Sequence, residues 1–148
     1  MKLKTLFVLS AIALLAGCAS GGMKPAELKA SMPVLKPDEG RVYFYRNASM
    51  FGAAIQPDIK VGDTVVGTSR PGGFFFVDRP AGDYEAHAST EVERKLSFAL
   101  APGENKYIRT SPSFGIMVGR INFELVNAPE AEGEMASLSY TGTVGAKE

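Results

Sequence analysis

Short runs of alternating apolar and polar residues dominate the chain from residue 40 onward. Residues 41–46 alternate between two faces and are rich in β-favouring side chains, which predicts a strand. Residues 74–77, Phe-Phe-Phe-Val, are continuously apolar and lie between glycine and proline breakers, which is typical of a strand buried on both faces. The same signals predict further strands at residues 58–61, 64–69, 84–88, 96–100, 106–110 and 121–125.

This spacing predicts an all-β fold. Seven or eight short strands at intervals of about ten residues, with little helix, favour an antiparallel β-sandwich. Helical signals are limited to a turn or two within residues 26–31 and a short stretch over residues 129–136. We therefore expect one domain over residues 40–136, followed by a small, polar and poorly ordered tail over residues 137–148.

The first 17 residues have the pattern of a secretory signal. Lys2 and Lys4 precede an apolar run over residues 6–15 that is shorter than the roughly 20 residues a membrane-spanning helix needs. Leu-Ala-Gly-Cys follows at residues 15–18 and resembles a lipobox, the cleavage motif of bacterial lipoproteins. We predict that residues 1–17 are removed and that Cys18 is lipidated; the alternative is an ordinary signal peptide with an incidental cysteine.

Residues 18–39 read as a flexible tether, because they contain several Gly and Pro residues and few apolar anchors. A flexible coil of this length would span about 25 Å. The residue after the cysteine is Ala19 rather than aspartate, which in bacterial lipoproteins favours the outer membrane. We therefore expect a lipid-anchored protein of the cell envelope, on the periplasmic face of the outer membrane where the host has two membranes.

The order of several motifs resembles a known family. The motifs are Gly-Arg-Val-Tyr-Phe-Tyr-Arg at residues 40–46, Phe-Phe-Val-Asp leading into Pro-Ala-Gly-Asp-Tyr at 75–84, Pro-Gly-Glu before Tyr-Ile-Arg at 102–109, and Val-Gly-Arg at 118–120. Together they resemble the bacterial lipoproteins grouped as domain of unknown function 2846, over roughly residues 40–134. The Pro-x-Gly-x-Tyr turn is also similar to that of surface modules of the PEGA and carboxypeptidase-regulatory type, which are β-sandwiches. The resemblance implies an envelope lipoprotein with a sandwich fold and carries over no catalytic residue.

The inventory of reactive side chains does not favour an enzyme or a metal site. His87 is the only histidine, and a period of two places it with Glu85 on the polar face of its strand, so we expect it to be exposed. Zinc sites need several His or Cys ligands, and we expect no metal and no cofactor. The 16 basic and 16 acidic side chains form no concentrated basic face, so we do not expect a nucleic-acid partner.

Two apolar, glycine-flanked segments lie between predicted strands, at residues 50–55 and 114–119. Exposed apolar loops mark contact sites, whereas buried ones would plug one end of the sandwich. Both interpretations remain open from the sequence. Under the contact hypothesis the interacting residues are Phe51, Ile55, Phe114, Ile116, Met117, Val118 and Arg120.

The function that these patterns favour is a non-catalytic binding or interaction module, displayed in the envelope by the lipid on Cys18. Its expected partners are the membrane and an envelope protein. One alternative is a purely structural envelope lipoprotein that binds no discrete ligand. Another is a hydrolase with an unrecognised site, for which loss of turnover in His87→Ala would be the support.

Overall fold

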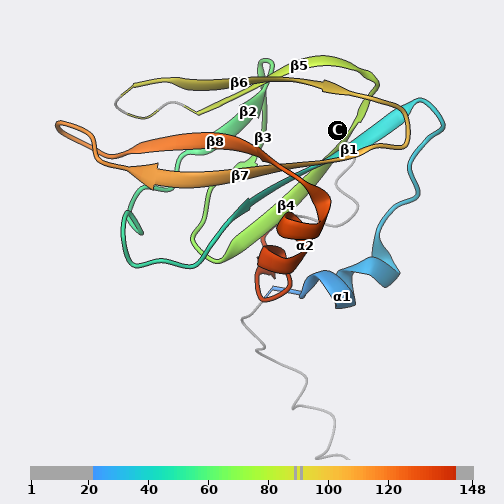
Figure 1. The fold of residues 1–148 in the computed structure, drawn as a ribbon, viewed down its shortest axis with the longest axis horizontal. Coiled ribbons are helices and arrows are strands. Elements are labelled where there is room, and N and C mark those ends of the chain that lie inside the picture. The colour runs from blue at the N-terminus through green and yellow to red at the C-terminus, as the bar shows by residue number, and fades with distance from the viewer. Residues whose placement is uncertain (1–21, 89, 91, 143–148) are drawn as a thin grey trace, which may run out of the picture.

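The computed structural model of the protein describes residues 22–88, 90 and 92–142 (Figure 1). The predicted signal peptide and Cys18 lie outside the described residues, as do residues 143–148. The elements in chain order are α1 (Pro25–Leu28), η1 (Lys29–Ser31), β1 (Glu39–Arg46), β2 (Asp58–Val61), β3 (Thr64–Thr68), β4 (Gly73–Pro80), β5 (Gly82–Ala88), β6 (Arg94–Leu100), β7 (Asn105–Ser113), β8 (Arg120–Val126), α2 (Ala128–Met135) and β9 (Ser139–Tyr140).

The strands form two sheets packed as a sandwich. Sheet A has the order β8-β7-β1-β4-β9, and sheet B has the order β3-β2-β5-β6. All eight predicted strands are present, so the prediction of an all-β sandwich is confirmed. Most pairs are antiparallel, but β1 pairs with β7 in parallel and β4 pairs with β9 in parallel. Sheet A is therefore mixed. The chain passes through sheet B between β1 and β4 and again between β4 and β7.

Strand β4 is buried on both faces, as its continuous apolar run predicts. Phe75 stacks on Phe44 with ring centroids 5.2 Å apart, and its ring fills the space where Gly67 of sheet B has no side chain. The neighbouring Phe74 points to the opposite face, where its ring lies 5.5 Å from that of Tyr140. Both phenylalanines are almost fully buried, so apolar material covers sheet A on two sides.

A third layer covers the outer face of sheet A. Figure 1 shows α1 and α2 on the side of sheet A that faces away from β5 and β6. Beneath them the aromatic side chains of sheet A form a continuous layer, in which Tyr43 stacks on Tyr107 at 5.0 Å and Phe76 on Tyr140 at 5.6 Å. The buried apolar side chains that cover this aromatic layer on its outer side are Leu28, Ala131, Met135 and Leu138.

The predicted domain limits of 40 and 136 are too narrow. Residues 22–39 do not form a flexible tether, since Leu28 is only 1% exposed and Pro33 accepts a hydrogen bond from Arg41 at 2.7 Å. Residues 137–142 are not a disordered tail either, because they contain β9. The two ends hold each other: Lys24 Nζ donates to the carbonyl of Ser137 at 2.7 Å. The physical reason is the aromatic outer face of sheet A, which needs an apolar cover.

Both predicted helices form. Pro25 begins α1, and the backbone N–H of Lys24 donates to the Glu27 carboxylate at 2.9 Å. Asn127 caps α2 by accepting a hydrogen bond from the backbone N–H of Glu130 at 3.1 Å. Among the described residues, none of the helices has the length and apolar content to cross a membrane.

His87 lies on the predicted face of its strand but is not an exposed surface side chain. Ala86 and Ala88 point into the core from the opposite face of β5, as expected. The His87 side chain is only 15% exposed, however, and its Nδ1 lies 3.8 Å from the Glu85 carboxylate. The reason is that β5 is an interior strand of sheet B, so that Lys60 on β2 and Lys95 on β6 flank His87 from both sides.

Candidate functional site

The two apolar loops meet at one end of sheet A. Strands β1 and β7 are parallel neighbours, with Tyr43 opposite Tyr107, so their C-terminal ends lie at the same edge of the sheet. The loop 47–57 follows β1, and the loop 114–119 follows β7. Phe51 and Phe114 touch edge to face, with ring centroids 4.8 Å apart. The sequence identified both loops, and the parallel pairing brings them together.

Glycines allow the two loops to interlock. Gly52 has a positive φ of 64° and lies against the ring of Pro112, which leaves no room for a side chain. Gly119 similarly has no space for a Cβ, because the Ile55 Cδ1 atom occupies it. Ile55 is half-buried at this junction and is the part of the loops that acts as a plug. Arg120 is also half-buried and pairs with Ser113 at the base of the β7–β8 hairpin.

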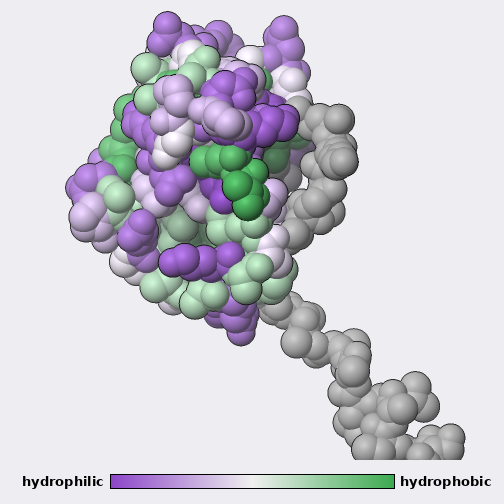
Figure 2. Space-filling view, turned by 90° about the vertical axis from the view of Figure 1, so that its right-hand side faces the viewer, coloured by the Kyte–Doolittle hydropathy of each residue, from purple (hydrophilic) through white to green (hydrophobic). Residues whose placement is uncertain are grey.

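The tips of the loops are exposed, which makes the core-plug interpretation wrong for them. We call these tip residues the apolar loop pair. Their exposed fractions are 92% for Met50, 44% for Phe51, 83% for Phe114, 87% for Ile116, 87% for Met117 and 59% for Val118. The opposite end of the molecule has a mostly hydrophilic surface with a small apolar area (Figure 2). A cluster of large apolar side chains at this exposure is typical of a contact surface.

A buried arginine holds the first loop in place. Arg46 ends β1 and is 1% exposed. Its guanidinium donates to the carbonyl of Ile55 at 2.6 Å and to that of Gly52 at 2.7 Å. A longer contact of 3.4 Å reaches the carbonyl of Ser69. All three acceptors belong to the backbone, and burial lowers the pKa of Arg46.

Arg46 is not among the residues predicted to be functional, although the sequence contains a signal for it. The alternation in residues 41–46 puts Arg46 on the same face as Val42 and Phe44, which point into the core. A cation at an inward position needs buried acceptors. The glycine-flanked loop that follows β1 supplies them, so the arginine and the loop form one unit.

A second polar cluster joins α2 to sheet A. Arg109 on β7 donates to Glu134 at 2.8 Å and to Glu124 at 2.9 Å, and Tyr45 donates to Glu134 at 2.5 Å. Burial raises the pKa of Glu134, but the hydrogen bonds from Tyr45 and Asn47 and the charge of Arg109 outweigh it, so the pKa is lowered. The side chains of this cluster bond one another across the junction of sheet A and α2. This indicates that the cluster holds the helix on the sheet.

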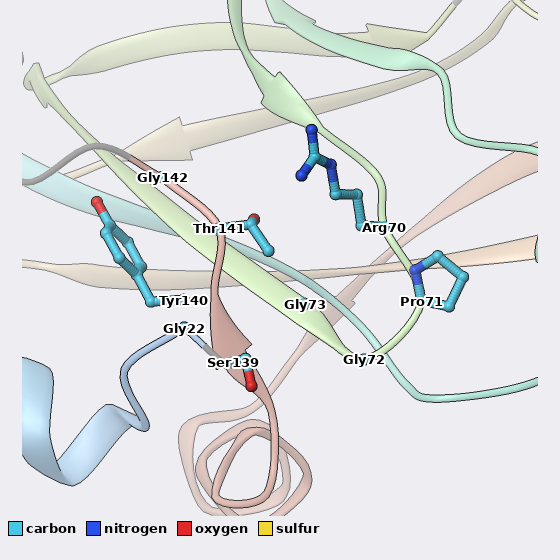
Figure 3. Close-up of a pocket in the computed structure, with 9 residues that line it drawn as sticks. All are labelled: Gly22, Arg70, Pro71, Gly72, Gly73, Ser139, Tyr140, Thr141 and Gly142. Carbon is cyan, nitrogen blue, oxygen red and sulfur yellow. The ribbon is translucent and has the colours of Figure 1, made fainter. Parts of the chain in front are cut away.

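An open hollow of about 510 Å³ lies beside β9 (Figure 3). Three segments form its wall, and its lining residues are Gly22, Arg70, Pro71, Gly72, Gly73, Ser139, Tyr140, Thr141 and Gly142. Four glycines leave much of this wall as bare backbone, so it offers few side chains to a ligand. In the described part of the chain, no group of three or more His, Cys, Asp or Glu side chains is arranged to hold a metal ion.

Comparison with known proteins gives a family without an assigned activity. The model of the family described as protein of unknown function (DUF2846) matches residues 36–121. An uncharacterized protein of Haemophilus influenzae is 29% identical over 130 residues, which cover 85% of this chain and 77% of that protein. No solved structure matches the chain. The family match spans more than half of the 148 residues. The chain therefore belongs to the DUF2846 family.

Proposed function

We propose that this protein is a lipid-anchored, non-catalytic interaction module of the bacterial envelope, and that the apolar loop pair is its contact surface. The observation that carries the proposal is the exposure of Phe114, Ile116 and Met117, each above 80%. Leaving large apolar side chains in water has a free-energy cost that a contact would remove. Two loops from different parts of the chain form this one surface.

The chemistry of the loop pair supports contact rather than catalysis. Its side chains are those of Phe, Ile, Met and Val, and none of these can act as a nucleophile or exchange a proton near neutral pH. His87, the histidine that a hydrolase would need, lies on β5 and is not one of the residues of the loop pair.

The lipid in this proposal is carried by Cys18, on the strength of the lipobox-like sequence at residues 15–18. The docking of residues 22–39 onto the domain shortens the predicted tether. Only four peptide units separate Cys18 from Gly22, and they span at most about 14 Å when fully extended. The domain would therefore sit close to the lipid headgroups. We expect the periplasmic face of the outer membrane where the host has two membranes.

Crosslinking in intact cells, followed by pull-down, tests the contact surface. We compare the natural protein with Phe114→Asp and with the matched control Val34→Asp, which changes a 95% exposed apolar residue outside the loop pair. Both variants should keep the free energy of unfolding within about 0.5 kcal/mol of the natural protein. Phe114→Asp should lose its contacts, and Val34→Asp should keep them. Retention of every protein adduct and every lipid adduct by a folded Phe114→Asp protein would refute the proposal.

Lipidation is tested separately. Cys18→Ser should accumulate as unprocessed precursor or as soluble protein, whereas the natural protein should fractionate with membranes. A mature-size Cys18→Ser protein in the membrane fraction would refute the lipid anchor.

A further inference from the structure

The loops that carry the apolar loop pair contain no charged side chain. Residues 47–57 and 114–119, and the last three residues of β7, include no Asp, Glu, Lys, Arg or His. The polar side chains among them are those of Asn, Gln and Ser. A protein partner is usually selected by directed hydrogen bonds and paired charges around an apolar centre. The loop pair offers few of either, so it carries little information that would select one protein surface over another.

The shape of the surface points the same way. Ile116 and Met117 are each 87% exposed, which means that they project from the hairpin rather than line a groove. Projecting apolar side chains suit a soft hydrocarbon medium, which moulds itself around them. The loop backbone needs hydrogen-bond partners, so only side chains enter hydrocarbon while the backbone stays at headgroup level.

The loops lie at a different place on the domain from the start of the described chain, which favours a second membrane contact. In Figure 1 the β7–β8 hairpin lies at the left end of the sandwich, whereas the chain enters beside α2 near the bottom. A single lipid attachment leaves a domain free to rotate about its link. A second contact at a different place on the surface fixes the face that the domain presents.

We propose that the apolar loop pair is a second membrane contact, inserting Phe114, Ile116 and Met117 into the leaflet that holds the lipid on Cys18. This inference rests on the proposed function and names the bilayer as the partner of the contact surface. Sheet B and its outer face are then held in a constant orientation to the membrane.

The experiment uses the full-length lipidated protein in phospholipid vesicles. Acylated Cys18 has no free thiol, and the chain has no other cysteine. A single cysteine introduced as Met117→Cys can therefore be labelled with an environment-sensitive nitrobenzoxadiazole dye. The control is Ala101→Cys, an exposed position just before β7. Strand β7 runs from Asn105 to Ser113, so the control lies at the other end of a strand about 30 Å long.

We expect the dye at position 117 to emit at shorter wavelength than the dye at position 101, and to be quenched by lipids that carry a nitroxide in the acyl chain. Adding Phe114→Asp to Met117→Cys should abolish both effects. Equal emission and equal quenching at the two positions would overturn the inference.

The outcomes separate the two proposals. The mass of the purified protein reports acylation directly, so an unacylated protein refutes the lipid anchor whatever the dye shows. An acylated protein with a water-exposed dye at position 117 refutes the bilayer contact alone. A discrete protein adduct from a photocrosslinker at position 117 in cells, together with a water-exposed dye, would identify a protein contact instead.

Discussion

Replacement of Arg46 by Met tests how the apolar loop pair is held in place. Met matches much of the length of the arginine stem but donates no hydrogen bond, so the carbonyls of Gly52 and Ile55 lose the hydrogen bonds from the guanidinium. We expect Arg46→Met to lower the free energy of unfolding and to open the loop 47–57 locally. The separation of Phe51 from Phe114 should follow.

The magnitude can be worked from two contacts. The guanidinium donates to Ile55 at 2.6 Å and to Gly52 at 2.7 Å. Hydrogen bonds to a charged group contribute roughly 1.5–3 kcal/mol each. The loss is partly offset, because a buried cation carries a desolvation cost of several kcal/mol that Met does not have. We therefore expect the free energy of unfolding to fall by about 1–3 kcal/mol.

Urea denaturation measures the global change, and amide hydrogen exchange measures the loop. The backbone N–H of Ile55 donates to the carbonyl of Gly52 at 2.9 Å and is the reporter. The control is Arg41→Met, which removes a buried arginine bound to Asp78 at 2.6 and 2.8 Å. Arg41→Met should destabilise the protein without faster exchange at Ile55. Unchanged exchange at Ile55 in Arg46→Met would refute the role assigned to the guanidinium.

Three further predictions concern the core, the chain ends and pH. Phe75→Ala should lower the free energy of unfolding by about 3–5 kcal/mol, because it opens a cavity between the sheets; a loss below about 1 kcal/mol in urea titration would contradict this packing. Tyr140→Ala should cost about 3 kcal/mol in the same assay, whereas a disordered tail would tolerate it. The folded pKa of Glu134 lies below its ordinary value of 4.5, so its contribution is present above that value and is lost as pH falls through the folded pKa. Near-ultraviolet circular dichroism should detect this step, and Glu134→Gln should lack it.

The strands could be predicted from the sequence because their signals are local. Residues 41–46 alternate along two faces, and the breakers around residues 74–77 delimit a buried strand. The sandwich follows from the number and spacing of such segments. The parallel pairing of β1 with β7 does not, since it joins residues about 60 positions apart and leaves no local trace. The meeting of Phe51 with Phe114 depends on that pairing, which is why the exposure of the loops remained open.

The burial of the two chain ends was missed for a different reason. Val42 and Phe44 occupy one face of β1, and Tyr43 and Tyr45 occupy the other. Apolar or aromatic residues on both faces of a strand require a cover on both sides. That requirement can be read in residues 41–46, but the one glycine and three prolines of residues 22–39 favoured a coil. Leu28 covers part of the outer face of sheet A. This contact depends on tertiary packing, which cannot be predicted from the composition of the segment.

The joining of the two chain ends determines how the protein would respond to mechanical load. The N–H of Tyr140 donates to the carbonyl of Met23 at 2.8 Å, and β9 is in turn a two-residue strand at the edge of sheet A. A pull on the N-terminus, as when a lipid is drawn away with its membrane, would reach this contact before it reached the core. Rupture of this contact would undock the N-terminal segment that contains Leu28 and would leave the strand pairing of the two sheets intact. Residues 22–35, once released, would lengthen the link by several nanometres. The distance between the domain and the membrane would therefore increase before the two sheets unfold.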